Sequence, residues 1–145
     1  TNHIYYWGDQ HYSLTMGPDR ASRMDACGPA KRLGVPYTIH SDAPVTPLDP
    51  LFTAWCAVNR QTASGRVLGP SERIEVHDAL HAITLGAAFT LHLDHLVGSI
   101  ESGKFADFAV LEDDPTDVPV EALKDIAVWG TVVDGTPRPA SQHGN

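Results

Sequence analysis

The run His-Ser-Asp-Ala-Pro-Val at 40–45 is the part of the sequence best suited to chemistry. It follows a short apolar and β-branched run, and Pro44 and Pro47 stiffen the loop after it. A carboxylate at the end of a strand can bind a divalent metal through one oxygen and accept a proton with the other. Asp42 is therefore a candidate catalytic residue and metal ligand. The same pattern also fits a turn in which the Asp42 side chain caps local N–H groups.

Two further groups of histidines have spacings that metal sites use. His77 and His81 lie four residues apart on a predicted helix, so both rings would share one face. Asp78 stands between them and the Glu of the metalloprotease pattern is missing, so a solvated helix face is the favoured interpretation. His, Asp and His also cluster within 92–95.

The elements that must position Asp42 begin with a predicted loop over residues 1–19, which is rich in aromatic residues and ends in a Gly-Pro turn. A helix is predicted over 20–33, with Gly28-Pro29 expected to kink or split it. Gly34 stands where the helix needs a left-handed residue to end. The β-branched and aromatic run 35–40 then predicts a strand that delivers polar residues at its C-terminal end.

Two stronger helices and a β unit are predicted after this strand. Asp49 and Pro50 form a helix start, and the helix runs to about Arg60. A loop over 61–73 and a second helix over about 76–88 follow. Towards the C-terminus the sequence predicts a strand at 106–111, a short helix at 120–125, a strand at 126–133, and an Asp-Gly hairpin turn at 134–135 leading to 136–138.

Composition limits the function classes. The chain has 145 residues and 18 acidic against 10 basic side chains, for a net charge of -8. An acidic chain without a basic cluster repels phosphate backbones, so we expect no nucleic acid partner. No apolar run approaches the roughly 20 residues that cross a bilayer, and no export segment opens the chain, so we expect a cytoplasmic protein without membrane contact. Cys27 and Cys56 lack metal-ligand spacing and are interpreted as small buried core residues.

The chain begins Thr-Asn-His, beside dense aromatic content, and has no initiator methionine, which indicates a piece of a longer protein. One strand within 1–95 cannot form a sheet by itself. The fold class is therefore predicted as α/β: residues 1–95 as the last part of an α/β barrel, 96–140 as strands of a small β domain, and 141–145 as a tail.

Several motifs together resemble the C-terminal region of amidohydrolase family 3, which includes enzymes like N-substituted formamide deformylase. The resemblance covers about residues 3–138 and rests on five runs. These are Trp-Gly-Asp at 7–9, His-Ser-Asp-Ala-Pro-Val at 40–45, Val-Asn-Arg at 58–60, Leu-Gly-Pro at 68–70, and Gly-Ser-Ile-Glu-Ser-Gly-Lys-Phe-Ala-Asp at 98–107.

The resemblance implies a (β/α)₈ barrel with one or two divalent metals, usually zinc, that activate a water to attack an amide-type bond. Asp42 matches the aspartate after the eighth strand, which moves the proton of that water to the leaving group. His3 and Trp7 would lie near the barrel mouth and contact a small amide-type substrate. His40 would support the site from beside the ligands, and the cluster at 92–95 would lie at the surface.

The family's other metal ligands have no counterpart in this sequence. No His-x-His occurs, and one aspartate cannot hold a catalytic zinc, which needs about three protein ligands. We therefore expect the isolated chain to be inactive and to bind no metal tightly. The unpaired strand and apolar helix faces favour a homo-oligomer. A non-catalytic assembly or binding module is the alternative function, and the sequence does not identify the substrate.

Overall fold

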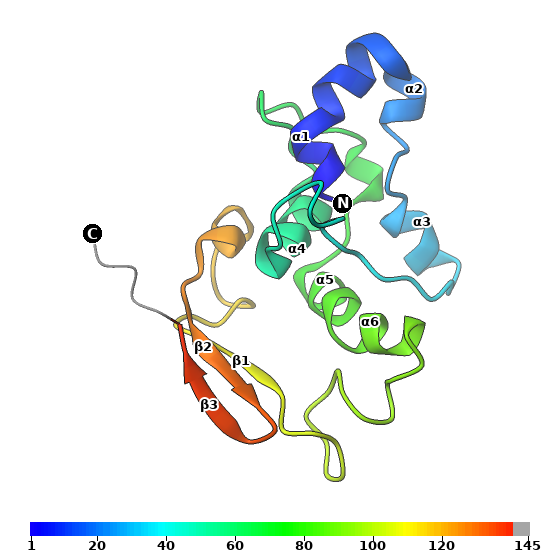
Figure 1. Ribbon diagram of the computed structural model, residues 1–145. Coiled ribbons are helices and arrows are strands. Elements are labelled where there is room, and N and C mark those ends of the chain that lie inside the picture. Colours follow the sequence, from blue (N-terminus) through cyan, green and yellow to red (C-terminus); the bar gives the residue numbers. More distant parts are fainter. Residues whose placement is uncertain (141–145) are drawn as a thin grey trace, which may run out of the picture.

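The computed structural model describes residues 1–140, and it places a group of helices before a small antiparallel sheet (Figure 1). The expected tail at 141–145 lies outside the described residues. The N-terminal helices are α1 (Asn2–Gln10), the π-helix η1 (His11–Thr15), α2 (Pro18–Ala21) and α3 (Cys27–Arg32). The later helices are α4 (Pro50–Asn59), the 3₁₀ turn η2 (Pro70–Glu72), α5 (Val76–Ile83) and α6 (Leu85–Thr90).

The first 19 residues are mostly helical, so the prediction of a loop there is wrong. Ile4 is fully buried, and the Tyr5 ring meets the Phe52 ring edge-on at 5.2 Å between centroids. Aromatic residues have only moderate helix propensity, but packing of one helical face against a neighbouring helix outweighs local preference. The aromatic run therefore forms α1 and packs on α4.

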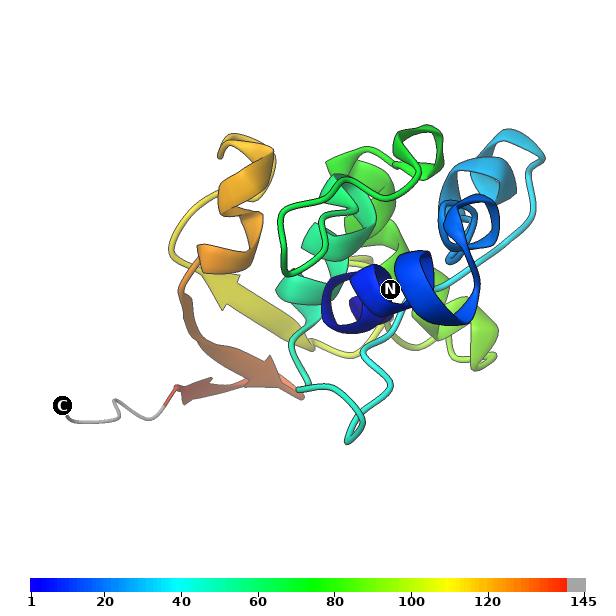
Figure 2. The same ribbon diagram turned by 90° about the horizontal axis from the view of Figure 1, so that it is seen from above.

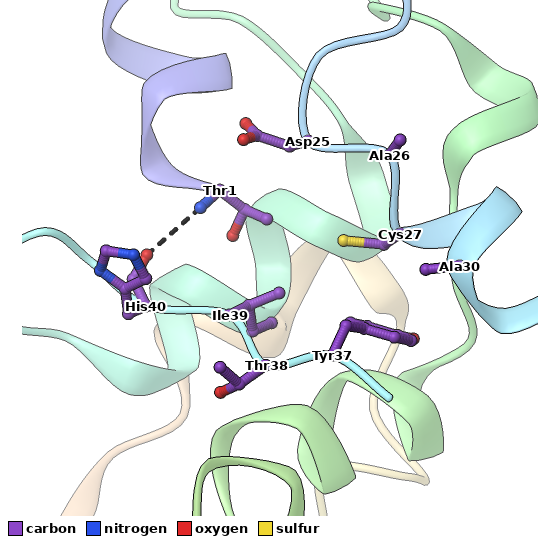
Figure 3. Close-up of a pocket in the computed structure, with 9 residues that line it drawn as sticks. All are labelled: Thr1, Asp25, Ala26, Cys27, Ala30, Tyr37, Thr38, Ile39 and His40. Atoms are coloured by element: carbon purple, nitrogen blue, oxygen red, sulfur yellow. Dashed lines mark hydrogen bonds between the residues drawn. The ribbon is translucent and has the colours of Figure 1, made fainter. Parts of the chain in front are cut away.

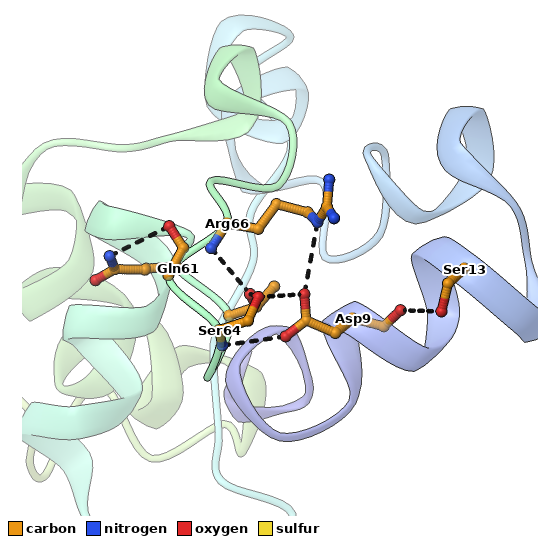
Figure 4. A network of polar contacts seen from close by, with 7 residues as sticks. Asp9, Ser13, Gln61, Ser64 and Arg66 are labelled. Atoms are coloured by element: carbon orange, nitrogen blue, oxygen red, sulfur yellow. Dashed lines mark hydrogen bonds and ion pairs between the residues drawn. The ribbon is translucent and has the colours of Figure 1, made fainter.

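A polar network attaches the C-terminal half of α1 to the loop after α4 (Figure 4). The Asp9 carboxylate accepts hydrogen bonds from the Ser64 backbone N–H at 3.2 Å and from the Ser64 hydroxyl at 2.8 Å. The Arg66 guanidinium lies 3.5 Å from the same carboxylate and 4.1 Å from the centre of the Tyr12 ring. These contacts hold the C-terminal half of α1, and hydrogen bonds of Thr1 and Asn2 hold its first turn.

The predicted helix over 20–33 is split, as Gly28-Pro29 led us to expect, but the break lies before these two residues. Helix α2 ends at Ala21, and α3 begins at Cys27. Pro29 falls in the first turn of α3, where a missing N–H costs little. Gly34 has a φ of 66° and follows the end of α3, which confirms the predicted left-handed terminus.

The segment 35–40 is extended but forms no strand, so that prediction is wrong for the described residues. A strand needs a neighbouring strand to bond with, and residues 1–140 place none beside it. Its contacts are instead with α5. The Thr38 hydroxyl donates to the Ala82 carbonyl at 2.8 Å, and the Ile39 N–H approaches the same carbonyl at 3.5 Å.

Helix α4 lies at the centre of the molecule and confirms its prediction. The Asp49 side chain caps it by accepting a hydrogen bond from the Phe52 N–H at 2.9 Å. Its residues are almost all buried, with Trp55 only 3% exposed. The predicted helix over 76–88 is divided into α5 and α6 at Thr84, whose hydroxyl donates back to the Leu80 carbonyl at 2.7 Å.

The C-terminal part forms a three-stranded antiparallel sheet in the order β1 (Phe108–Leu111), β2 (Val128–Val133) and β3 (Thr136–Pro139). The predicted strands at 106–111 and 126–133 are thus confirmed with slightly shorter bounds. Asp134 and Gly135 both have positive φ, 49° and 73°, which is the tight hairpin turn that Asp-Gly favours. The 3₁₀ helix η3 (Val120–Asp125) occupies the predicted short helix.

The core connects the helices with the C-terminal part. Helix η3 lies against α4 (Figure 2), where the Trp55 indole N–H donates to the Glu121 carbonyl at 2.9 Å. Leu123 and Ile126 belong to the same hydrophobic cluster as the residues of α4 and α5. The structure thus combines helices with an antiparallel sheet, which agrees with the α/β class in its coarse form. Among the described residues, no helix is long and apolar enough to cross a membrane.

Candidate catalytic site

Asp42 lies at a left-handed turn directly after the extended segment 35–40. Its φ is 63°, and its backbone carbonyl accepts a hydrogen bond from the Val45 N–H at 2.8 Å. Its side chain is 48% exposed and lines a cavity of about 260 Å³. The other residues of this cavity are Thr1, His3, Asp25 and His40. The turn fixes the backbone and leaves the carboxylate at the edge of an open space.

His3 approaches Asp42 from the first turn of α1. Its Nε2 lies 3.3 Å from Oδ2 of Asp42, and its side chain is 40% exposed. The two atoms are within ion-pair distance, yet within residues 1–140 the buried Nε2 makes no aligned hydrogen bond. The Trp7 ring meets His3 edge-on at 4.9 Å, one helical turn further along. The structure therefore brings His3 to Asp42, whereas Trp7 contacts His3 and does not line the Asp42 cavity.

His40 supports the turn through its own ring. Its Nδ1 accepts a hydrogen bond from the Asp42 backbone N–H at 2.9 Å, so the neutral ring carries its proton on Nε2. Its carbonyl accepts a hydrogen bond from the Thr1 nitrogen at 3.2 Å, which Figure 3 shows. His40 thus contacts the Asp42 backbone rather than its carboxylate.

A buried polar chain sets the distance between α1 and the turn. The Asn2 amide donates to the Thr46 hydroxyl at 2.9 Å, and that hydroxyl donates to the Ser41 carbonyl. All three residues are at most 6% exposed. Buried hydrogen bonds of this kind are costly to break, because the separated groups would lack water. Asn2 directly precedes His3 and Ser41 directly precedes Asp42, so these hydrogen bonds hold His3 beside Asp42.

A family model described as "Amidohydrolase family" matches residues 1–138. The chain belongs to the amidohydrolase family. It is 34% identical to N-substituted formamide deformylase of Arthrobacter pascens over 131 residues, which are 90% of this chain and 23% of that protein. It is 41% identical to Protein LONG AFTER FAR-RED 3 of Arabidopsis thaliana over 98 residues, 66% of this chain and 16% of that protein.

A shorter similarity connects this amidohydrolase chain to guanine deaminase of Escherichia coli (strain K12), at 42% identity over 52 residues, 36% of the chain and 11% of that protein. The chain thus spans less than a quarter of the length of these curated relatives. No solved structure shows a significant match.

The donors of this amidohydrolase chain fit part of a metal site. Carboxylate is a ligand type that zinc accepts, and Asp42 supplies one at the edge of the cavity. Within the described range 1–140, no three His, Cys, Asp or Glu side chains converge closely enough to hold an ion. His77 and His81 are exposed on α5, and the histidines at 92–95 are exposed as well. None of these four rings lines the Asp42 cavity.

The two cysteines of this amidohydrolase chain are free and buried, as the sequence predicted. Burial raises the pKa of the Cys56 thiol to about 12 and also raises the pKa of Cys27. A thiol needs a lowered pKa to act as a nucleophile at neutral pH. Neither cysteine is therefore a candidate nucleophile.

Sequence reasoning missed Asp25, which lines the same cavity as Asp42. It falls in the middle of the predicted helix 20–33, where an aspartate indicates an exposed helix face. The structure instead gives it a left-handed φ of 50° in the break between α2 and α3. No pattern in the sequence distinguishes it from the other aspartates, because its place depends on the chain reversal between α2 and α3.

Proposed function

We propose that the longer protein containing this chain is a metal-dependent hydrolase of carbon–nitrogen bonds, and that Asp42 moves the proton in its reaction. One observation carries the proposal: the half-exposed Asp42 carboxylate shares a cavity with the His3 and His40 rings, inside the region matched by the amidohydrolase family. A carboxylate at an open cavity with an imidazole 3.3 Å away is suited to accepting and returning a proton.

A divalent metal, with zinc as the proposed ion, would supply the activation of the attacking water when bound. Asp42 would be the ligand that this chain contributes. The remaining ligands would come from a part of the longer protein outside this chain, since a catalytic zinc needs about three protein ligands.

The residues of this chain would have separate roles in the reaction. Asp42 accepts the proton that the water loses and gives it to the leaving nitrogen, which departs as a neutral amine. His40 holds the Asp42 backbone N–H, so the carboxylate keeps its direction through the turn. His3 forms part of the wall of the cavity against which a small amide-type substrate would lie, and Trp7 contacts the His3 ring edge-on.

The names of two relatives support a carbon–nitrogen bond as the target. One relative is a deformylase of N-substituted formamides and another is a deaminase of guanine, and both reactions break a bond between carbon and nitrogen. The deformylase matches 90% of this chain, so an N-substituted formamide is the substrate class we propose first.

The alternative, a non-catalytic assembly or binding module, is favoured by exposed apolar side chains. Phe89 at 50% and Leu91 at 67% exposure lie at the end of α6, and Trp129 at 43% lies on β2. A groove of about 390 Å³ beside α6 includes Val35 and Leu85. We propose that this chain by itself buries these surfaces in a homo-oligomer, because large apolar patches seldom stay in water.

The test replaces Asp42 by Asn in the longer protein, with N-benzylformamide as the substrate. Asn keeps the shape of Asp but cannot accept the proton, so kcat should fall about 10²–10⁴-fold. Asp113→Asn is the matched control, because Asp113 is exposed on the loop after β1 and should leave kcat unchanged. Near-normal kcat in a folded, metal-loaded Asp42→Asn enzyme would remove Asp42 from the mechanism.

A further inference from the structure

Asp25 places a second carboxylate in the cavity that Asp42 lines. In Figure 3 its side chain leaves the segment before α3 and points away from Cys27, towards the side on which Thr1 and His40 lie. Asp25 also borders the adjoining cavity of about 230 Å³, between Thr1 and Tyr37. The two cavities share Thr1, Asp25 and His40, so the Asp25 carboxylate lies where they meet.

The backbone of Asp25 is held from behind by a buried arginine. The Arg60 guanidinium donates to the Asp25 carbonyl at 3.0 Å, to the Met24 carbonyl at 2.7 Å and to the Leu68 carbonyl at 2.6 Å. Arg60 is fully buried and has a left-handed φ of 52°. The hydrogen bonds of the guanidinium go to these three backbone carbonyls, and within residues 1–140 none goes to the Asp25 carboxylate.

A close approach on the other side fixes the same segment. A Cβ atom at Gly69 would lie 1.8 Å from the Ser22 carbonyl oxygen, so only glycine fits there. Asp25 itself adopts a left-handed backbone with a φ of 50°, which is uncommon for residues other than glycine. Strained residues that the surrounding structure over-determines are concentrated at functional sites.

The Asp25 carboxylate has an unmet hydrogen-bonding need. Its Oδ2 is buried and has no hydrogen-bond partner within residues 1–140. In the same cavity, the buried Nε2 of His3 also lacks an aligned hydrogen bond. Buried polar atoms are almost always paired, so each unpaired one indicates a missing partner. Two residues that line the cavity thus each carry an unpaired polar atom, a carboxylate oxygen that can accept and an imidazole nitrogen that can donate.

A secondary amide carries the complementary pair: one N–H donor and one carbonyl acceptor. We propose that Asp25 is a substrate-recognition residue that accepts the N–H of the amide, while His3 Nε2–H donates to the amide carbonyl. The site would therefore select secondary amides over tertiary amides, which have no N–H. This inference rests on the proposed hydrolase function and adds a specificity-determining residue to it.

The test compares two formamides in the longer protein, N-benzylformamide with its N–H and N-benzyl-N-methylformamide without one. The wild type should favour the first by about 10- to 100-fold in kcat/KM, the value of a hydrogen bond to a charged group. Asp25→Gly removes the carboxylate at a position whose positive φ suits glycine, and it should reduce this ratio to a few-fold. Asp134→Gly, with a similar φ of 49° in the β2–β3 turn, is the matched control and should keep the wild-type ratio.

Asp25→Asn distinguishes the effect of a weaker acceptor from the effect of the extra space that Asp25→Gly leaves in the cavity. Asn tolerates a left-handed backbone and has the size of Asp, but its neutral oxygen is a weaker acceptor. A ratio between those of the wild type and Asp25→Gly supports the proposal, whereas a wild-type ratio in both Asp25 variants overturns it while leaving the hydrolase function intact. Absence of wild-type turnover with either formamide would instead refute the proposed function, and this inference with it.

Discussion

Replacing Arg60 by Met should strongly destabilise the chain. The guanidinium satisfies three backbone carbonyls, through a buried hydrogen bond to residue 68 and partly buried ones to residues 24 and 25. Each buried acceptor left without a donor costs about 1–3 kcal/mol. Met fills most of the same volume, so the cavity contribution is small. Burial lowers the pKa of Arg60 because the charged form is less stable away from water, so removing the charge offsets part of the loss in stability.

The net expectation for Arg60→Met is a loss of about 4 kcal/mol in the free energy of unfolding. Small domains have about 5–15 kcal/mol in total, so the variant would be close to unfolding. Urea denaturation followed by tryptophan fluorescence and far-UV circular dichroism measures the change. At an m-value of about 2 kcal/mol/M the midpoint should fall by about 2 M.

Arg66→Met provides the comparison. Arg66 is 46% exposed on its side chain and contacts Asp9 and the Tyr12 ring at the surface. Exposed contacts of these kinds contribute at most about 1 kcal/mol each. Arg60→Lys should resemble Arg60→Met, because one ammonium cannot reach three carbonyls in fork geometry. An Arg60→Met midpoint within 0.5 M of Arg66→Met, roughly 1 kcal/mol, would show that the three carbonyls find water or that the buried charge cancels their contribution.

Three further results are expected. Burial alone would raise the pKa of Asp9, but hydrogen bonds from Ser64, Thr62 and Arg66 outweigh it and hold the pKa below its ordinary 3.8. The wild type should therefore gain stability over Asp9→Asn above pH 3.8 and lose that gain as pH falls below it, which acid titrations of both proteins would measure. Elemental analysis of the purified chain should find well under one zinc per monomer, and a stoichiometric, tightly held zinc would contradict the partial ligand set. Sedimentation at micromolar concentration should show dimers or larger species, and a clean monomer that binds no hydrophobic dye would disprove the proposed assembly.

Local signals in the sequence were sufficient where an element depends on its own residues. The Asp49 cap, the left-handed end at Gly34 and the turn at 134–135 follow from backbone preferences that neighbours do not change. The strands β1 and β2 were predictable because each has the other as its hydrogen-bonded neighbour in the sheet.

Elements that depend on distant partners were not predictable in this way. Helix α1 forms because Tyr5 packs against Phe52, a contact between residues far apart in sequence. The extended run 35–40 has strand residues but finds α5 beside it rather than another strand. At the candidate site, the motif identified Asp42, whereas Asp25 depends on the fold-back between α2 and α3 and carries no local pattern.

Two kinds of residue surround Asp25: residues that hold its backbone, and residues whose side chains line the cavity. Arg60 and Gly69 hold the segment 22–26 through backbone atoms, so they do not depend on which side chains that segment carries. Ala26 follows Asp25, is exposed and lines the adjoining cavity of about 230 Å³. A change at Asp25 or Ala26 therefore alters the lining, while Arg60 and Gly69 keep their backbone contacts. Libraries that vary residues 25 and 26 while keeping residues 60 and 69 therefore give a compact route to altered cavity linings on an unchanged backbone.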